Sequence, residues 1–165
     1  MWRSACPRSR PRRWDATRRD SLDVTPLMRS PPAGYSGTPL ATKLGITAGS
    51  RVVTRHAPVD YVELLEPLPP GAVLERRISR RTDVVHVFSD RKANLRAELA
   101  TLRTSIRSDG AIWVSWPRRA SKVPTDITEA TVRELALPLG LVDVKVCAVS
   151  DVWSGLKLVI RKELR

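Results

Sequence analysis

The sequence predicts an α/β fold: a three-layer, Rossmann-like sandwich of about six strands, mostly parallel, with an antiparallel C-terminal strand. Three observations lead to this prediction. From residue 40 onward, apolar runs of strand length alternate with segments of helical period. The run from Asp83 to Phe88 is almost continuously apolar, as is typical of a central parallel strand covered on both faces. The last two apolar runs follow each other closely, without a helical segment between them, which favours an antiparallel hairpin.

The first half of the domain contains two short predicted helices and three predicted strands. Thr38 and Pro39 are typical of a helix start, and Gly45 of a helix end. Asp60 can cap a second short helix that runs to Leu65 and ends at the PLPPG turn. The predicted strands are residues 51–56 (RVVTRH), 73–78 and 83–88 (DVVHVF).

The second half contains the clearest helix of the chain. Ser89 or Asp90 can cap it, and Asp109-Gly110 stops it. Its apolar residues recur at helical spacing: Leu95, Leu99, Leu102 and Ile106. A strand at 111–116 (AIWVSW) follows, and then a helix that Asp126 and Glu129 open as a capping box. Two final strands, residues 141–149 and 156–161, are joined through a Ser154-Gly155 turn, which makes the last strand antiparallel.

Residues 1–35 are predicted to form a disordered, basic tail in front of a single α/β domain, residues 36–165. More than half of the first 32 residues are Arg, Pro or Ser, and the apolar residues among them show no period. Two interpretations of residues 1–27 stay open: an arginine-rich tether for nucleic acid, or a translated upstream stretch with Met28 as the real start. From Met28 onward, 22 basic and 14 acidic residues leave a net charge of +8, so the predicted domain is itself basic.

Composition argues against several classes of protein. No apolar run approaches the ~18 residues of a membrane helix, and no apolar segment of a signal peptide follows the basic N-terminus. Cys6 and Cys147 lie too far apart in the chain for a disulfide framework or a cysteine-rich zinc site. We therefore expect a cytoplasmic protein without a membrane segment and without a metal site.

The order of elements resembles the C-terminal half of class I S-adenosylmethionine-dependent methyltransferases, a fold whose last strand is also antiparallel. Three stretches also resemble an actinobacterial family of small proteins of unknown function: SGTPLATKLGI, WVSWP with SKVPTD, and LPLGLVDVKVCAV with WSGLKLVIRKE. The resemblance covers nearly everything from Ser36 to Arg165. It implies a truncated methyltransferase-like fold and no established activity.

The sequence departs from the methyltransferase pattern at both parts of cofactor recognition. Those enzymes follow the first strand with a glycine-rich loop, but here the first strand runs into Arg55-His56-Ala57-Pro58, and proline is a poor substitute for a permissive glycine. The region where an acidic residue would bind the ribose hydroxyls offers Arg76, Arg77, Ser79, Arg80 and Arg81 instead. We therefore predict no cofactor, and S-adenosylmethionine only under an alternative interpretation.

The candidate ligand-binding residues come from segments that end at the carboxyl edge of the predicted sheet, where α/β proteins bind ligands. The loop that follows the fourth strand places three cations, two hydroxyls and an indole together, which suits phosphate or carboxylate binding. His56 ends the first strand at the same edge and could act as an anion donor or general base. The predicted anion-binding set is His56, Ser115, Trp116, Arg118, Arg119, Ser121 and Lys122. The competing interpretation is a solvated basic loop with Trp116 in the core.

Other reactive side chains are interpreted as structural. His86 lies in the middle of an apolar strand, which favours a buried, hydrogen-bonded histidine. No Walker A, HExxH or GxSxG motif occurs, and no catalytic residue is predicted. The preferred function is a non-catalytic Rossmann-like module that binds an anionic small molecule or an acidic protein partner. The alternatives are a methyltransferase with an atypical cofactor loop and, less favoured, a nucleic-acid-binding protein.

Overall fold

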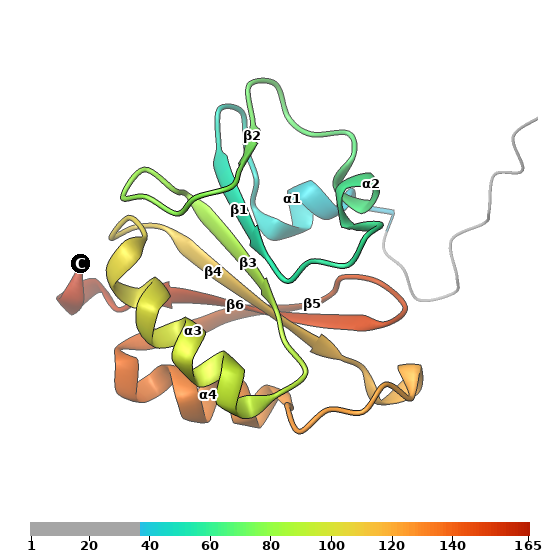
Figure 1. Cartoon of the computed structure of the whole chain (residues 1–165). Helices are drawn as coiled ribbons and strands as arrows, with labels where there is room; N and C mark the ends of the chain where they lie inside the picture. Colours follow the sequence, from blue (N-terminus) through green and yellow to red (C-terminus); the bar gives the residue numbers. More distant parts are fainter. Residues whose placement is uncertain (1–36) are drawn as a thin grey trace, which may run out of the picture. The chain divides into compact units, whose positions relative to one another are not determined.

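The computed structural model describes residues 37–165, so the predictions for the tail and for a start at Met28 fall outside the described residues. Six strands form one mixed sheet in the order β2-β1-β3-β4-β6-β5 (Figure 1). They are β1 Arg51–Arg55, β2 Val73–Glu75, β3 Val84–Phe88, β4 Ala111–Pro117, β5 Leu141–Ala148 and β6 Trp153–Ile160. Strands β2, β1, β3 and β4 are parallel neighbours, and β6 is antiparallel to both β4 and β5. The predicted α/β fold, with six mostly parallel strands and an antiparallel last strand, is confirmed.

Helices cover both faces of the sheet, which makes three layers. The helices are α1 Leu40–Leu44, α2 Tyr61–Leu65, α3 Lys92–Ser105 and α4 Glu129–Ala136, with short 3₁₀ turns η1 Arg119–Ser121, η2 Leu137–Leu139 and η3 Lys162–Leu164. Figure 1 shows α3 and α4 side by side across one face, with α1 and α2 grouped away from them.

Two apolar clusters correspond to the two faces. Side chains alternate along a strand, so Val85 and Val87 of β3 face the cluster beneath α3 and α4, whereas Val84 and Phe88 face the cluster beneath α1 and α2. All five residues of β3 are buried, which explains its continuous apolar run.

Several local predictions were wrong, among them the cap of α3, which neither Ser89 nor Asp90 provides. The predicted Ser154-Gly155 turn lies inside β6, and the β5–β6 hairpin turns earlier, around Ser150, whose hydroxyl accepts hydrogen bonds from the backbone N–H groups of Val152 and Trp153, both at 3.2 Å. A Ser-Gly dipeptide is typical of a turn, but here Gly155 lies within β6 and pairs with Ser115 of β4 in the sheet.

The predicted capping box at α4 was also wrong. Thr128 caps α4 by accepting a hydrogen bond from the Thr131 N–H at 3.3 Å. The carboxylate of Asp126 instead accepts a hydrogen bond from the Lys92 N–H at 2.6 Å, at the first residue of α3. A cap from a distant segment satisfies a helix end as well as a local one does, but local sequence gives no sign of it.

Candidate functional site

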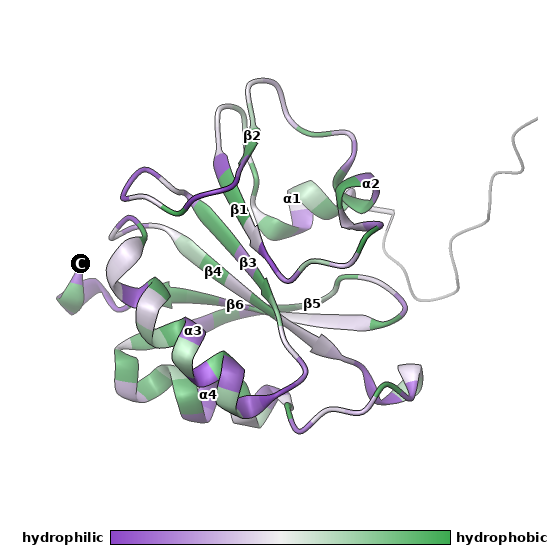
Figure 2. Ribbon diagram, viewed as in Figure 1, coloured by the Kyte–Doolittle hydropathy of each residue, from purple (hydrophilic) through white to green (hydrophobic). Residues whose placement is uncertain are grey.

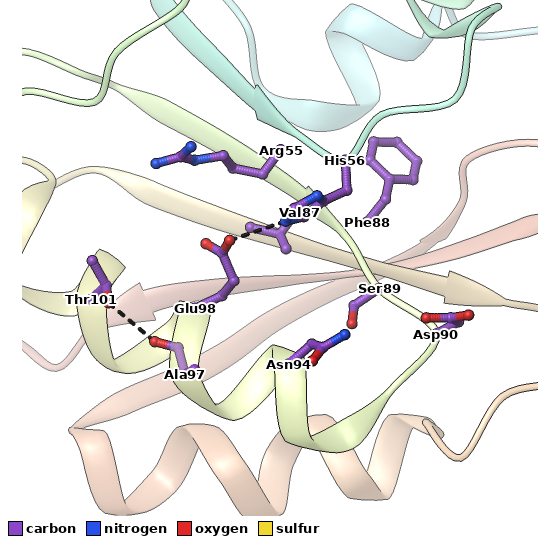
Figure 3. Close-up of a pocket in the computed structure, with 10 residues that line it drawn as sticks. All are labelled: Arg55, His56, Val87, Phe88, Ser89, Asp90, Asn94, Ala97, Glu98 and Thr101. Atoms are coloured by element: carbon purple, nitrogen blue, oxygen red, sulfur yellow. Dashed lines mark hydrogen bonds and ion pairs between the residues drawn. The ribbon is translucent and has the colours of Figure 1, made fainter.

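A crevice opens where the carboxyl ends of β1 and β3 meet the side of α3. Strand β2, which follows β1 in the chain, is the neighbour of β1 on one side, and β3 is its neighbour on the other side. The strand order therefore reverses at β1. Ligands of open α/β sheets bind at such a point. The crevice has a volume of about 540 Å³, and its polar lining includes Arg55, His56, Ser89, Asp90, Asn94 and Glu98 (Figure 3).

His56 shapes one wall of this crevice. It follows β1 directly and has a φ of 55°, in the left-handed region that favours glycine. Its Nε2 lies 3.1 Å from Glu98 Oε1 of α3, an ion pair when the imidazole is protonated (Figure 3). A non-glycine residue held in this conformation costs free energy and is often found at functional sites. The chain therefore makes a glycine-like turn after β1 without a glycine.

The charged and polar groups around His56 are arranged along the crevice. Arg55 is exposed, and its guanidinium has no ion-pair partner among the described residues. Figure 3 shows Arg55 and Asp90 at opposite ends, with Ser89 and Asn94 close to the Asp90 end. The crevice thus offers a cation at one end and a carboxylate at the other.

Sequence reasoning missed the contribution of α3. Asn94, Glu98 and Thr101 line the crevice and recur at helical spacing, directly beside the apolar stripe of the same helix. The sequence contains one pattern that could have indicated this wall of the crevice, namely a polar stripe at that spacing on a helix that follows a central strand. By itself it does not differ from an ordinary solvated helix face.

The predicted basic loop forms a second, separate cavity of about 620 Å³ at the same edge of the sheet. Trp116, Arg118 and Arg119 line it, together with Thr125, Thr128 and Glu129 among others. Arg118 also makes hydrogen bonds to the β5–β6 hairpin. Its backbone N–H donates to Val152 O at 2.7 Å, and its guanidinium donates to Ser150 O at 3.5 Å.

The other members of the predicted set lie elsewhere. Ser115 lies inside β4 and is completely buried. The hydroxyl of Ser121 donates to Arg118 O at 2.6 Å and so shapes η1, and Lys122 is exposed in a left-handed conformation at the end of that turn. Neither Ser121 nor Lys122 lines either cavity. The structure therefore divides the predicted set between the crevice, the basic-loop cavity, the loop surface and the core.

The backbone of Asp90 links the chain segments that line the two cavities. Its carbonyl oxygen accepts hydrogen bonds from Thr125 Oγ1 at 2.9 Å and from the Asp126 N–H at 3.3 Å. These bonds hold the segment after the basic loop against the end of β3 and the start of α3.

A chain of hydrogen bonds joins Tyr61, His86 and Ser115 inside the core. The Tyr61 hydroxyl bonds His86 Nδ1, and the Ser115 hydroxyl bonds His86 Nε2 at 2.6 Å. Each of the three residues is at most 1% exposed. Burial lowers the pKa of His86 to about 3 and raises the pKa of Tyr61 above its ordinary value, so the imidazole and the phenol are both neutral. These side chains resemble a catalytic triad in type, but their burial leaves no access for a substrate.

Three further features bear on function. In residues 37–165 no cluster of three or more His, Cys, Asp or Glu side chains is placed to hold a metal ion. No helix in the described part of the chain combines the length and hydrophobicity needed to cross a bilayer. Burial raises the pKa of the half-buried Cys147 thiol, which works against a reactive thiolate.

The arrangement of strands and helices is similar to that of solved methyltransferases. A SAM-dependent methyltransferase from Aquifex aeolicus superposes with a TM-score of 0.51 and 9% identity over 73% of this chain and 88% of that one. A possible exported protein from Bordetella parapertussis superposes with a TM-score of 0.52 and 11% identity over 74% of this chain and 65% of that one. At these identities the similarity shows the fold alone, which is a class I methyltransferase-like, Rossmann-like fold.

No curated protein matches the sequence. One family model does match, and it spans residues 70–162, more than half of the chain. The matched segment runs from the turn before β2 through β6 and includes the α3 wall of the crevice and the whole basic loop. The chain belongs to this family, DUF3052, a family of proteins of unknown function.

Proposed function

We propose that the domain is a non-catalytic module that binds an anionic small molecule in the crevice between β1, β3 and α3. One observation carries the proposal: Arg55, a cation without an ion-pair partner among residues 37–165, lies at the point of the sheet where α/β folds bind their ligands. A volume of about 540 Å³ suits a small metabolite.

The charges around the crevice favour an anionic group at the Arg55 end. The carboxylate of Glu98 faces His56, so no carboxylate of the described domain pairs with the guanidinium of Arg55. Guanidinium groups bind phosphate or carboxylate through two parallel hydrogen bonds. At the other end, Asp90 and Asn94 can accept hydrogen bonds from hydroxyl or amino groups (Figure 3). The expected ligand therefore carries an acidic group at one end and hydrogen-bond donors at the other.

Two features support binding without methyl transfer. After β1 the chain continues as His56-Ala57-Pro58, and the proline removes a backbone N–H where a glycine-rich loop would approach a cofactor. At the end of β2, Glu75 Oε1 accepts a hydrogen bond from Arg51 at 2.6 Å, which occupies a carboxylate that could otherwise bind ribose hydroxyls.

Glu75 is also the observation that keeps the methyltransferase alternative open. The sequence predicted arginines and a serine in place of an acidic residue in this region, but the last residue of β2 is Glu75. In addition, the left-handed His56 reproduces the turn that a glycine would allow. A methyltransferase with an atypical cofactor loop is therefore the second candidate function.

Thermal unfolding tests the proposal. Inorganic phosphate and ATP, each compared with chloride at equal ionic strength, should raise the Tm, because a ligand at ~100 times its Kd adds about 2.7 kcal/mol to the free energy of unfolding. Arg55→Gln should abolish this increase. The matched control is Arg118→Ala with Arg119→Ala in the basic loop, which should keep it.

The opposite pattern would place the anion site in the basic-loop cavity and contradict the proposal. A saturable increase in Tm with S-adenosylmethionine would favour the methyltransferase. If no anion raises the Tm of the wild type, an acidic protein partner becomes the preferred hypothesis, to be sought by pull-down with the Arg118/Arg119 variant as control.

A further inference from the structure

The segment between β2 and β3 carries the densest group of unpaired cations in the described part of the chain. We call residues 76–81 the arginine loop. Its arginines are all exposed, and none of their guanidinium groups has a hydrogen-bond or ion-pair partner among the described residues: Arg76, Arg77, Arg80 and Arg81. Figure 2 shows this connection as a mostly hydrophilic stretch that leaves β2 and returns to the start of β3.

The acidic residues on either side of the arginine loop are already paired with other arginines. Glu75 accepts from Arg51 at 2.6 Å. Asp83 accepts from the guanidinium of Arg107 at 2.7 Å and from the backbone N–H of Arg51 at 2.8 Å. Among the described residues, the two carboxylates that flank the loop are therefore not free to neutralise its four charges.

The fold holds the arginine loop in a defined conformation. The Ser79 N–H donates to Thr82 Oγ1 at 2.9 Å, the Thr82 N–H donates to Ser79 O at 2.9 Å, and the Arg81 N–H donates to Ser79 Oγ at 3.2 Å. Ile78 packs against the cluster beneath α3 and α4, and Thr82 is completely buried. A fixed loop loses less backbone entropy on binding than a flexible one does.

From this arrangement we infer that the arginine loop is a binding surface for the phosphate backbone of nucleic acid. Arginine forks match phosphate oxygens, and backbone contacts of this kind need cations and no particular base sequence. The net charge of +12 adds long-range attraction for a polyanion. None of the four arginines lines the crevice, so this surface is separate from the proposed ligand site.

An acidic protein is the less favoured partner because of what the arginine loop lacks. Stable protein interfaces centre on buried apolar or aromatic residues. The one apolar residue of the loop, Ile78, is half-buried and packs inward. The outward surface therefore consists of guanidinium groups and a serine, which suits phosphate contacts better than a protein interface.

The test measures binding of the full chain to a fluorescein-labelled DNA duplex by anisotropy, between about 50 and 200 mM salt. One variant replaces the four arginines of the loop by glutamine. A control variant removes the same charge from exposed cations elsewhere, namely Arg91→Gln, Arg96→Gln, Arg161→Gln and Lys162→Gln. Four phosphate contacts contribute a slope of about 3.6 in log K against log salt, so a fourfold rise in salt should weaken binding about 150-fold through this loop alone.

We expect the loop variant to bind weakly with a shallower salt dependence, and the control variant to keep most of the wild-type slope. Replacing the same four arginines by lysine keeps the charge and should restore most of the slope, which separates loss of cations from damage to the fold. Equal losses in the loop and control variants would overturn the inference, since binding would then follow total charge. Binding of poly-glutamate through the loop, without binding of DNA, would also overturn it and identify an acidic protein as the partner.

Discussion

At the scale of single residues, the core contains a buried histidine, His86, that is hydrogen-bonded to two hydroxyl groups. His86 lies among aromatic rings, stacked on Phe88 with ring centroids 4.3 Å apart, and both of its ring nitrogens have hydroxyl partners. A buried polar group without a partner costs about 1–3 kcal/mol, so Tyr61 and Ser115 make this histidine tolerable in the core. The same burial lowers the pKa of the His86 imidazole.

The burial of His86 predicts acid sensitivity with a defined sign. In the unfolded chain the imidazole binds a proton below its ordinary pKa of 6.5, whereas in the folded chain the pKa is about 3. The unfolded state therefore gains protons first as the pH falls, and the contribution of His86 to stability, present above pH 6.5, is lost progressively toward pH 3. Between pH 7 and 5 the free energy of unfolding should fall by about 2 kcal/mol more in the wild type than in His86→Gln.

Urea unfolding at the two pH values measures this difference. His56→Gln is the comparison, because it removes an exposed histidine and leaves the buried one in place. An NMR titration that found His86 protonated near pH 6.5 in the folded protein would contradict the prediction.

Gly155 is the second residue whose identity the packing requires. A Cβ at this position would lie 2.9 Å from Val149 Cγ2, 3.2 Å from Ser115 Oγ and 3.4 Å from Trp113 Cε3. Gly155→Ala should therefore lower the free energy of unfolding by about 1–3 kcal/mol, as overpacked cores do. Gly37→Ala is the control, since a Cβ there meets nothing within 4 Å. Equal Tm values for the two variants would show that β6 can move away from β4 at little cost.

At the scale of elements, the start of α3 depends on a residue from a distant segment. Asp126→Ala removes the acceptor for the Lys92 N–H and should cost about 1 kcal/mol, in the range of an N-cap. Asp126→Asn keeps an acceptor oxygen and should retain most of that free energy. Thr128→Ala removes the cap of α4 and is the comparison.

Hydrogen exchange locates the effect of each variant. Exchange of the Lys92 amide should accelerate in Asp126→Ala, and exchange of the Thr131 amide in Thr128→Ala. Faster exchange at the Glu129 amide in Asp126→Ala would instead support the capping box that the sequence suggested.

At the scale of the whole molecule, the two clusters of buried residues in the described domain extend from Leu40 to Ile160. A chain that begins at Met28 should therefore fold and melt within a degree or two of the full chain. A Tm lower by several degrees would mean that residues 1–27 contribute ~1 kcal/mol or more, since that amount shifts a domain of this size by a few degrees. The prediction of a disordered tail would then be wrong.

Local chemistry made the order of elements predictable. The hydrophobic period of α3 reflects burial of one stripe of the helix, and the apolar run of β3 reflects burial of both faces of the strand. Both patterns involve only residues that are close together in the sequence. The alternating pattern of residues 141–149 likewise predicted a strand. It did not show that Val144 and Val146 stay exposed, because β5 lies at the edge of the sheet and a register shift between Asp143 and Lys145 breaks the alternation.

The sequence by itself determined the fold class and the edge of the sheet where a ligand site belongs, because the carboxyl ends of parallel strands must meet. Only the tertiary structure decided which side chains come together there. His56 meets Glu98 across 42 residues, and Asp126 meets Lys92 across 34. Ser115 lies in the core rather than in the basic loop because β4 continues to Pro117. Such pairings depend on strand register and helix position, which arise from packing of the whole domain and leave no local pattern in the sequence.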